Sequence, residues 1–469
     1  MIIHYLIYAV FAYYVLLHGL YLFLILIGAT QLRHHSRGIT FGEFQRIADS
    51  SLTMPMTVII PAYNEGVIIV NTVLCALRLR YPQHEVIVVN DGSADNTMEV
   101  LINHFGLRRV DKVGLKSIAT KEVRAVYESA EFSNLVVVDK ENGRRADAIN
   151  AAVSYSRYPL LCVIDADCMV EEDGLLRMVR PFLRDSRVVA AGGVVRPSNG
   201  LVAYDGKILS AELPHNMLAL NQEIEYARSF HWARIGLSKL NSMLCISGAF
   251  MLVKKDVFIA VGGTWRDSIT DDIEFTIRLS RHVYDRENRQ QQKIVYVPDA
   301  VCYTEVPDTL SQYASQRNRW QRGTLQALMR SIGMMFNPRY GLAGLFGMPF
   351  FLFFEALAAV VETLGYVLVV VALVMGIATG TEILLFFYLA FVLGTLLSLA
   401  AVLLKETTRL RTANKRDLWR LIWAAITDNL GYHQLHLLIR FVGTFDYFIR
   451  RRVDLGAVMV RTGVKEKHA

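Results

Sequence analysis

The sequence predicts an α/β domain built on a largely parallel sheet, together with helices that lie in or on a membrane. One observation is a series of short, β-branched apolar runs between residues 55 and 303, separated by stretches of helical character. The other is composition, because 53% of the 469 residues are hydrophobic and the mean hydropathy is +0.30. Such a chain is too apolar to be wholly soluble, so part of it is expected in a bilayer.

The net charge of +7 fits either a nucleic-acid partner or a membrane protein with basic cytoplasmic loops. The basic residues concentrate beside the apolar stretches, which favours the membrane and argues against nucleic acid. The five cysteines form no Cys-x-x-Cys pair. We therefore expect neither a zinc site nor a disulfide framework, and we interpret the cysteines as small core residues in a reducing compartment.

The strand candidates are residues 57–60, 86–89, 135–138, 161–164 and 188–191. They are apolar on both faces, as are the strands of a parallel sheet that helices cover. Ligands of such sheets bind beyond the carboxyl ends of the strands. Polar motifs follow three of the strands: Pro61-Ala-Tyr-Asn-Glu65, Asn90-Asp91-Gly92-Ser93 and Asp165-Ala-Asp167. Three acidic strand ends therefore predict a binding site on one rim.

Asp165 and Asp167 predict a metal and diphosphate site. Two carboxylates so close repel each other unless a cation lies near them, and Mg²⁺ or Mn²⁺ binds through one or two carboxylates while keeping positions for phosphates. The alternative for an isolated Asp-x-Asp is a solvated turn after a strand. Residues 200–207 do not form a P-loop, because Ile208 stands where Ser or Thr would bind the metal. No Gly-x-Gly-x-x-Gly follows a strand either.

Two further motifs point to catalysis. The cluster Thr270-Asp271-Asp272-Ile273-Glu274 opens an expected helix, and Asp272 is the candidate base for an attacking hydroxyl. The alternative is a helix N-terminus with stabilising acidic residues. In Gln316-Arg317-Asn318-Arg319-Trp320, Arg319 can bind a phosphate and Trp320 offers a flat face to a sugar. Here the alternative is a basic-aromatic membrane anchor.

Apolar stretches set the expected membrane topology. Residues 2–27 are long enough to span a bilayer, which takes about 20 helical residues, and the basic residues after them place the N-terminus outside. Residues 421–448 have basic residues at both ends, which favours an interfacial or re-entrant segment over a fourth span. We divide the chain into a transmembrane helix at 1–30, an α/β domain at 50–323, an interfacial amphipathic helix or packed helix at 324–340, two transmembrane helices at 341–404 and a basic, interfacial or re-entrant segment at 405–469.

In this order along the chain, these motifs resemble those of the membrane-integrated family 2 glycosyltransferases, over roughly residues 57–323. Most similar are the processive synthases of β-linked polysaccharides such as poly-N-acetylglucosamine, chitin, hyaluronan and cellulose. The resemblance implies the GT-A nucleotide-sugar fold with a mixed, mostly parallel sheet, a UDP-sugar donor, Mg²⁺ or Mn²⁺, and inverting transfer. It also implies an integral plasma (inner) membrane protein whose catalytic domain is cytoplasmic.

The resemblance also implies roles for single residues. Asp272 would be the base, and Asp167 would bind the metal, with Asp165 beside it at the sugar diphosphate. The uridine would be held by Ala62, Tyr63, Glu65, Asp91 and Asp147. The acceptor and the diphosphate would lie near Ser247, Gly248, Asp271, Gln316, Arg319 and Trp320. The sequence departs from the family pattern at Asn90, Arg144, Arg145 and Asp271, where the family often has Asp, Gly, Lys and Glu.

Other functions stay open at this point. One is a non-processive transferase that adds a single sugar to a lipid-linked acceptor. Another is a transporter or channel, motivated by Glu355 and Glu362 on one face of an apolar helix. The spans are too few for an ordinary transporter, but a conduit for a nascent polymer is compatible with them. The expected partners are a UDP-sugar, a polysaccharide or lipid-linked acceptor and membrane lipids, and no nucleic acid is expected.

Overall fold

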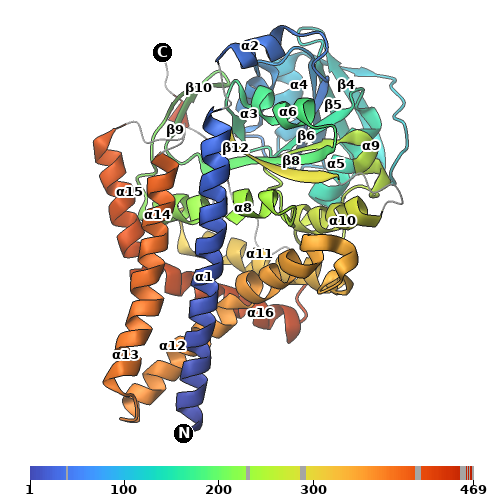
Figure 1. Cartoon of the computed structure of the whole chain (residues 1–469). Coiled ribbons are helices and arrows are strands. Elements are labelled where there is room, and N and C mark those ends of the chain that lie inside the picture. The colour runs from blue at the N-terminus through green and yellow to red at the C-terminus, as the bar shows by residue number, and fades with distance from the viewer. Residues whose placement is uncertain are drawn as a thin grey trace. The chain divides into compact units, whose positions relative to one another are not determined.

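The structure is a computed structural model that describes residues 1–37, 41–228, 233–285, 292–406, 414–454, 461, 463 and 465–466. The chain forms two compact units, each built from segments that are separated in the sequence (Figure 1). The helical unit combines residues 1–37, 216–242 and 307–458. The sheet unit combines residues 38–215, 243–306 and 459–469. Residues 216–242 and 307–323, expected within an α/β domain at 50–323, thus belong with the helical unit.

The sheet unit is built on a ten-stranded mixed sheet in the order β3-β4-β5-β2-β1-β6-β11-β8-β12-β7. The strands are β1 (Met56–Ala62), β2 (His84–Asn90), β3 (Leu107–Val110), β4 (Val123–Ser129), β5 (Leu135–Lys140), β6 (Leu160–Ile164), β7 (Met169–Val170), β8 (Val188–Pro197), β11 (Phe250–Lys254) and β12 (Lys293–Thr304). The central strands β5, β2, β1 and β6 run parallel and are almost completely buried. The predicted strands and the mixed, mostly parallel sheet are confirmed. Apolar runs of this kind suit a sheet that is covered on both faces.

Helices cover the sheet within this unit. They are α2 (Phe41–Asp49), α3 (Ile69–Leu77), α4 (Thr97–Phe105), α5 (Arg144–Tyr155), α6 (Gly174–Arg184), α9 (Lys255–Ala260) and α10 (Asp271–Asp285). Helices α3 and α5 contact β1 and β2, and α6 contacts β8 and β12. A second, three-stranded sheet joins β9 (Leu201–Tyr204), β10 (Lys207–Ala211) and β13 (Lys465–Glu466), in which β13 pairs in parallel with β9.

The helical unit contains the apolar helices. Its elements are α1 (Ile2–Arg37), α7 (Met217–Tyr226), α8 (Arg234–Lys239), α11 (Leu310–Arg330), α12 (Ala358–Val374), α13 (Gly380–Phe387), α14 (Gly394–Glu406), α15 (Lys415–Thr427) and α16 (His433–Phe448). Among the described residues, three stretches are long and apolar enough to cross a membrane: Ile2–Thr30, Ala343–Val374 and Gly380–Glu406. They coincide with the three spans that the sequence predicts.

The remaining helical segments are shorter than the apolar pattern suggests. Helix α11 ends at Arg330, and its Leu325 and Leu328 are buried inside the helical unit, so the expected location of residues 324–340 on a membrane surface stays a prediction. Residues 421–448 form two helices, because the backbone leaves the helical conformation at Leu430 and Gly431. Gly431 has a φ of 137°, which favours glycine. No fourth stretch of spanning length is found in the described part of the chain.

Candidate active site

The acidic strand ends meet at one edge of the sheet unit. Strands β1 and β2 are neighbours in register, so Ala62 pairs with Asn90, and the Asp91 N–H donates to the Ala62 carbonyl at 2.9 Å. Strand β6, on the other side of β1, ends directly before Asp165. Tyr63 is 41% exposed on the loop after β1. The strand ends therefore meet as predicted, and because ligands of parallel sheets bind at such an edge, a binding site there stays a prediction.

Asp165, Asp167 and Cys168 form a cluster in which one ligand atom of each lies within 4.8 Å of the others. Burial raises the pKa of the Asp167 carboxyl, and the charge of Asp165 raises it further. A divalent cation would stabilise both ionised carboxylates, so this oxygen donor set fits Mg²⁺ or Mn²⁺. The Cys168 thiol donates to Asp167 Oδ1 at 3.5 Å, and burial raises its pKa well above the usual value. Cys168 thus donates a hydrogen bond to the carboxylate of Asp167, a role that its position in the sequence did not indicate.

Arg145, near the start of α5, joins three parts of the site. Its Nε donates to Asp165 Oδ1 at 2.7 Å, its Nη1 to Asp271, and its Nη2 to the Gly248 carbonyl at 2.8 Å. A Cβ at Gly248 would lie 2.9 Å from Arg145 Nη2, so the absence of a side chain there permits this contact. The preceding residue, Ser247, is half-buried. In the sequence Arg145 stands out only as a departure from a family pattern, and nothing local links it to Asp271.

Asp272, the expected base, opens α10 beside the same loop. Its Oδ2 accepts a hydrogen bond from the Gly248 N–H at 3.0 Å, and its Oδ1 accepts one from the Ile273 N–H at 2.8 Å. Burial raises the pKa of the Asp272 carboxyl, and the charge of Asp271 raises it further. A carboxylate with a raised pKa is a stronger proton acceptor near neutral pH. Through Gly248 and Arg145, Asp272 is connected to the cluster at Asp165.

Lys140 is a buried residue of the site that sequence reasoning missed. Its Nζ lies between Asp91 Oδ1 and Asp147 Oδ2, 2.7 Å from each. The Gly143 N–H also donates to Asp91 at 3.0 Å, and Arg266 pairs with Asp147. Both carboxylates are therefore bound to donors of the protein, and their expected contact with uridine stays a prediction. A lysine at the end of a strand is usually solvated, so its sequence position does not indicate this role.

Arg461 brings a positive charge from the C-terminal segment to the same cluster. Its Nη1 lies 2.9 Å from Asp167 Oδ2 and donates to the Glu305 carbonyl at 2.9 Å. The Gly463 N–H donates to Glu305 Oε2 at 3.2 Å. Burial raises the pKa of nearby Glu65 to about 8, with Asp167 raising it and Arg461 lowering it. Residues 461, 463 and 465–466 thus belong to the sheet unit, and the expected interfacial or re-entrant location within residues 405–469 stays a prediction.

Gln316, Arg319 and Trp320 lie on α11, in the helical unit. There, Arg317 donates to the Gln316 side chain, and its guanidinium carbon lies 4.2 Å from the centre of the Trp320 ring. Arg317 is itself buried and pairs with Glu225 at 3.0 Å. Arg317, which sequence reasoning did not single out, therefore organises this motif. The expected contacts of Gln316, Arg319 and Trp320 with acceptor and diphosphate stay predictions.

Known proteins resemble this chain over the same region. Residues 54–323 match the family described as glycosyltransferase like family 2, and residues 283–423 match the one described as chitin synthase. The poly-beta-1,6-N-acetyl-D-glucosamine synthase of Staphylococcus aureus (strain COL) is 29% identical over 276 residues, which are 59% of this chain and 56% of that protein. The enzyme of the same name from Staphylococcus epidermidis is 29% identical over 273 residues, 58% of this chain and 55% of that protein. The chain thus aligns with just over half the length of these curated relatives.

A solved structure also resembles it, the mannosyltransferase PcManGT from Pyrobaculum calidifontis in complex with GDP-Man and Mn²⁺. The likeness covers 90% of this chain and 99% of that one, with a TM-score of 0.49 and 18% sequence identity.

Arg461→Gln is expected to tighten the binding of Mn²⁺ to the nucleotide-free protein. The guanidinium competes with a cation for Asp167, so its removal should lower the Kd roughly tenfold, or about 1.4 kcal/mol. Electron paramagnetic resonance of free Mn²⁺ measures the affinity. Arg452→Gln, which removes an arginine that pairs with Asp454 in the helical unit, is the control and should leave the affinity unchanged. Weaker or equal binding in Arg461→Gln would contradict the competition.

Lys140→Met is expected to destabilise the sheet unit strongly. It leaves Asp91 and Asp147 buried without their shared cation, and breaking a buried ion pair typically costs about 3–5 kcal/mol. Thermal unfolding should show a lower apparent Tm. Adding Asp147→Asn to Lys140→Met should recover part of the loss, since it removes one of the two like charges. If the double variant were no more stable than Lys140→Met, the repulsion between the two carboxylates would not be the cause.

Proposed function

Because the chain belongs to glycosyltransferase family 2, we propose that it is a membrane-bound, inverting enzyme that transfers a sugar from a UDP-sugar to a growing β-linked polysaccharide. The observation that carries this proposal is the network from Asp165 through Arg145 and Gly248 to Asp272. It joins a candidate metal and diphosphate site to a candidate base. The names of the matched relatives and the chitin synthase match favour a processive synthase. The alternative is the addition of a single sugar to a lipid-linked acceptor.

Asp167 would hold Mg²⁺ or Mn²⁺, with Asp165 beside it at the sugar diphosphate. The bound cation would supply Lewis-acid stabilisation of the charge on the leaving UDP. Arg145 keeps Asp165 in place through Nε, and its charge lies close to the expected position of the diphosphate. Arg461 would exchange its contact with Asp167 for solvent or phosphate when the cation binds.

Asp272 would take the proton from the acceptor hydroxyl. The hydroxyl oxygen would then attack the anomeric carbon on the face opposite UDP, so a single displacement inverts the stereochemistry. The Gly248 N–H holds Asp272 Oδ2, which fixes the direction of the carboxylate. Ser247 and Gly248 would border the acceptor sugar, together with Asp271. The proposal also keeps the expected roles of Gln316, Arg319 and Trp320 toward the acceptor and the diphosphate, which rest on the family motif.

The nucleotide would lie at the strand ends. Ala62, Tyr63 and Glu65 of the loop after β1 would contact the uridine, and the exposed ring of Tyr63 offers it a stacking surface. Asp91 and Asp147 would also belong to the uridine site. Lys140 pairs with both and holds their carboxylates in place.

The sheet unit is proposed to be cytoplasmic, with the helical unit in the plasma (inner) membrane. The stretches that follow the first and third candidate spans, residues 31–37 and 407–420, are rich in basic residues. Such residues concentrate on the cytoplasmic side of membrane proteins.

Asp272→Asn is expected to lower kcat by about 10²–10⁴-fold, the range for loss of a general base, while UDP binding stays unchanged. Release of UDP from a panel of UDP-sugars with Mn²⁺ measures the rate, and titration calorimetry measures the binding. Asp272→Glu keeps a carboxylate and should recover part of the activity. Normal turnover in Asp272→Asn would refute the assignment of the base.

The rate should also fall at acidic pH. The pKa of Asp272 is raised, so its carboxylate is protonated at a higher pH than an ordinary aspartate, whose pKa is about 3.9. The acidic limb of the kcat profile should therefore lie above that pH, and activity should be regained as the pH rises through it. A limb that stays in place in Asp272→Glu would indicate that another group titrates.

A processive synthase should make long products from the start of the reaction. Radiolabelled product, separated by size after less than one turnover per acceptor on average, should contain chains of many residues. Products extended by one residue only would contradict processivity and favour the lipid-linked alternative.

A further inference from the structure

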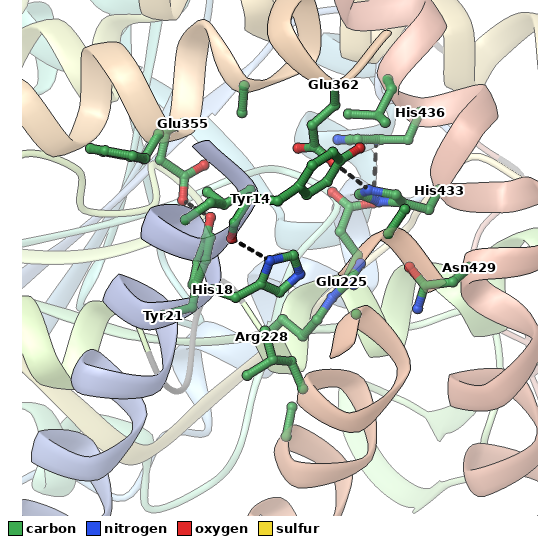
Figure 2. Close-up of a pocket in the computed structure, with 18 of the residues that line it drawn as sticks. Tyr14, His18, Tyr21, Glu225, Arg228, Glu355, Glu362, Asn429, His433 and His436 are labelled. Atoms are coloured by element: carbon green, nitrogen blue, oxygen red, sulfur yellow. Dashed lines mark hydrogen bonds and ion pairs between the residues drawn. The ribbon is translucent and has the colours of Figure 1, made fainter. Parts of the chain in front are cut away.

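Charged groups in cavities normally have partners within the protein, as the helical unit illustrates. Figure 2 shows polar side chains from α1, α7, α12 and α16 around a cavity of about 190 Å³ in that unit. There, Tyr21 donates to Glu355 at 2.6 Å, and Arg228 pairs with Asp428 at 3.0 Å. Charged groups away from bulk water are usually satisfied in this way. A cavity of the sheet unit differs, because two basic side chains in its wall lack such partners among the described residues.

This second cavity, of about 690 Å³, lies between α5 and the loop that joins β3 to β4. Its lining consists of residues 113, 114 and 116–123 of the loop and strand and of Ala151, Ser154 and Tyr155 of α5. None of the residues assigned above to the metal, the donor or the acceptor is among these lining residues. The volume falls in the range of about 300–1,000 Å³ that is typical of small-molecule sites. The cavity is therefore large enough for a ligand of its own.

Hydrogen bonds fix the shape of the loop at both ends of the cavity. The Leu115 N–H donates to the Ser154 carbonyl at 2.8 Å, which ties the first part of the loop to α5. The Lys121 N–H donates to Asp147 Oδ2 at 3.1 Å, which ties the last part to the same helix. Because these bonds are made within the protein, the cavity is formed before any ligand binds, and less ordering is then needed on binding.

The two unpaired basic side chains are Lys116 and Lys121. Neither ammonium group has a hydrogen-bond or ion-pair partner among the described residues. Lys112 of the same loop lies outside the lining, and its Nζ pairs with Glu128 Oε1 at 2.8 Å. Glu122 is the one carboxylate in the lining, against two ammonium groups, so the wall carries a net positive charge. Such a wall attracts an anion.

Hydroxyl groups complete the set of donors. Four of the lining residues carry one: Ser117, Thr120, Ser154 and Tyr155. A phosphate monoester offers three acceptor oxygens and a charge of about −1.5 to −2 at neutral pH. Lysine binds phosphate as a compact charge, and hydroxyls can donate to the remaining oxygens. The combination of lysines and hydroxyls therefore suits a phosphate group better than an uncharged ligand.

We propose that this cavity binds the phosphate group of a small phosphorylated molecule or of a lipid headgroup. Both sources share the chemistry that the lysines and hydroxyls recognise. Val113 and Leu115 are 95% and 74% exposed on the same loop, and they offer apolar contact beside the charges to either source. The inference is independent of the proposed function, because it uses no residue of the candidate active site.

Protection of single lysines from acetylation in the purified full-length protein tests the proposal. The soluble probe is pyrophosphate, without divalent cation and at constant ionic strength. The lipid probe is a nanodisc that contains phosphatidic acid, compared with one of phosphatidylcholine alone. Mass spectrometry measures the acetylation rate at each lysine. The rates at Lys116 and Lys121 should fall about tenfold at saturation, whereas the rate at Lys207, exposed on β10, should not change.

The outcomes distinguish the sources. Protection by pyrophosphate would identify a site for free phosphorylated molecules, and protection by phosphatidic acid alone would identify a site for lipid headgroups. If neither probe protected Lys116 and Lys121, or if Lys207 were protected equally, the proposal would be overturned.

The double variant Lys116→Gln, Lys121→Gln locates the binding. Its affinity for the probe that protects the natural protein, measured by calorimetry, should be about tenfold lower because two charge-assisted contacts are lost. Lys112→Gln is the matched control, since Lys112 lies in the same loop, outside the lining, and should leave the affinity unchanged. Equal affinity in the double variant and the natural protein would overturn the proposal. The protection experiment on the natural protein holds whether or not the variant folds.

Discussion

Repulsion between carboxylates at the ends of buried strands is the constraint on which the sheet unit depends. At an effective dielectric constant near 20, two like charges about 4 Å apart repel by roughly 4 kcal/mol, a large part of the about 5–15 kcal/mol that keeps a domain folded. A basic side chain lies beside each of these carboxylates: Lys140 between Asp91 and Asp147, Arg145 at Asp165 and Arg461 at Asp167. These cations also connect the elements of the site.

The placement of the acidic residues could be predicted from the sequence, because β-branched runs that are apolar on both faces suit only a covered sheet. Parallel strands then bring their carboxyl ends to one edge, which gathers Asp91 and Asp165 without further information. The counter-charges could not be predicted in this way. A lysine or arginine has the same sequence appearance whether it is solvated or buried, and Arg145 and Arg461 reach their partners only through the tertiary fold.

In the helical unit, too, the partners of buried basic residues could not be predicted from the sequence. Residues 307–323 look like part of a soluble domain because charged and polar residues are frequent in them. In the structure Arg317 and Arg322 are nevertheless almost fully buried. Glu225 pairs with the first, and the carbonyls of Arg452 and Asp454 accept hydrogen bonds from the second. Buried charges of this kind are tolerated only where partners from distant segments satisfy them, and composition alone does not reveal these partners.

Two of the long apolar stretches contain a π-helical turn, at Phe350–Ala356 and at Tyr388–Leu393, and these turns constrain the number of residues in the helices. A π turn contains one residue more than the α-helical turn that it replaces. It therefore also sets the direction in which every following residue of the helix points. Deleting one residue from Phe350–Ala356 would turn α12 by about 100° relative to its preceding segment. Glu362 would leave its side of the helix, and Gly365, where a Cβ would lie 2.7 Å from Val10 Cγ1, would no longer face α1. Substitutions in these helices can be absorbed locally, whereas the number of residues in them cannot change without moving a whole helix face.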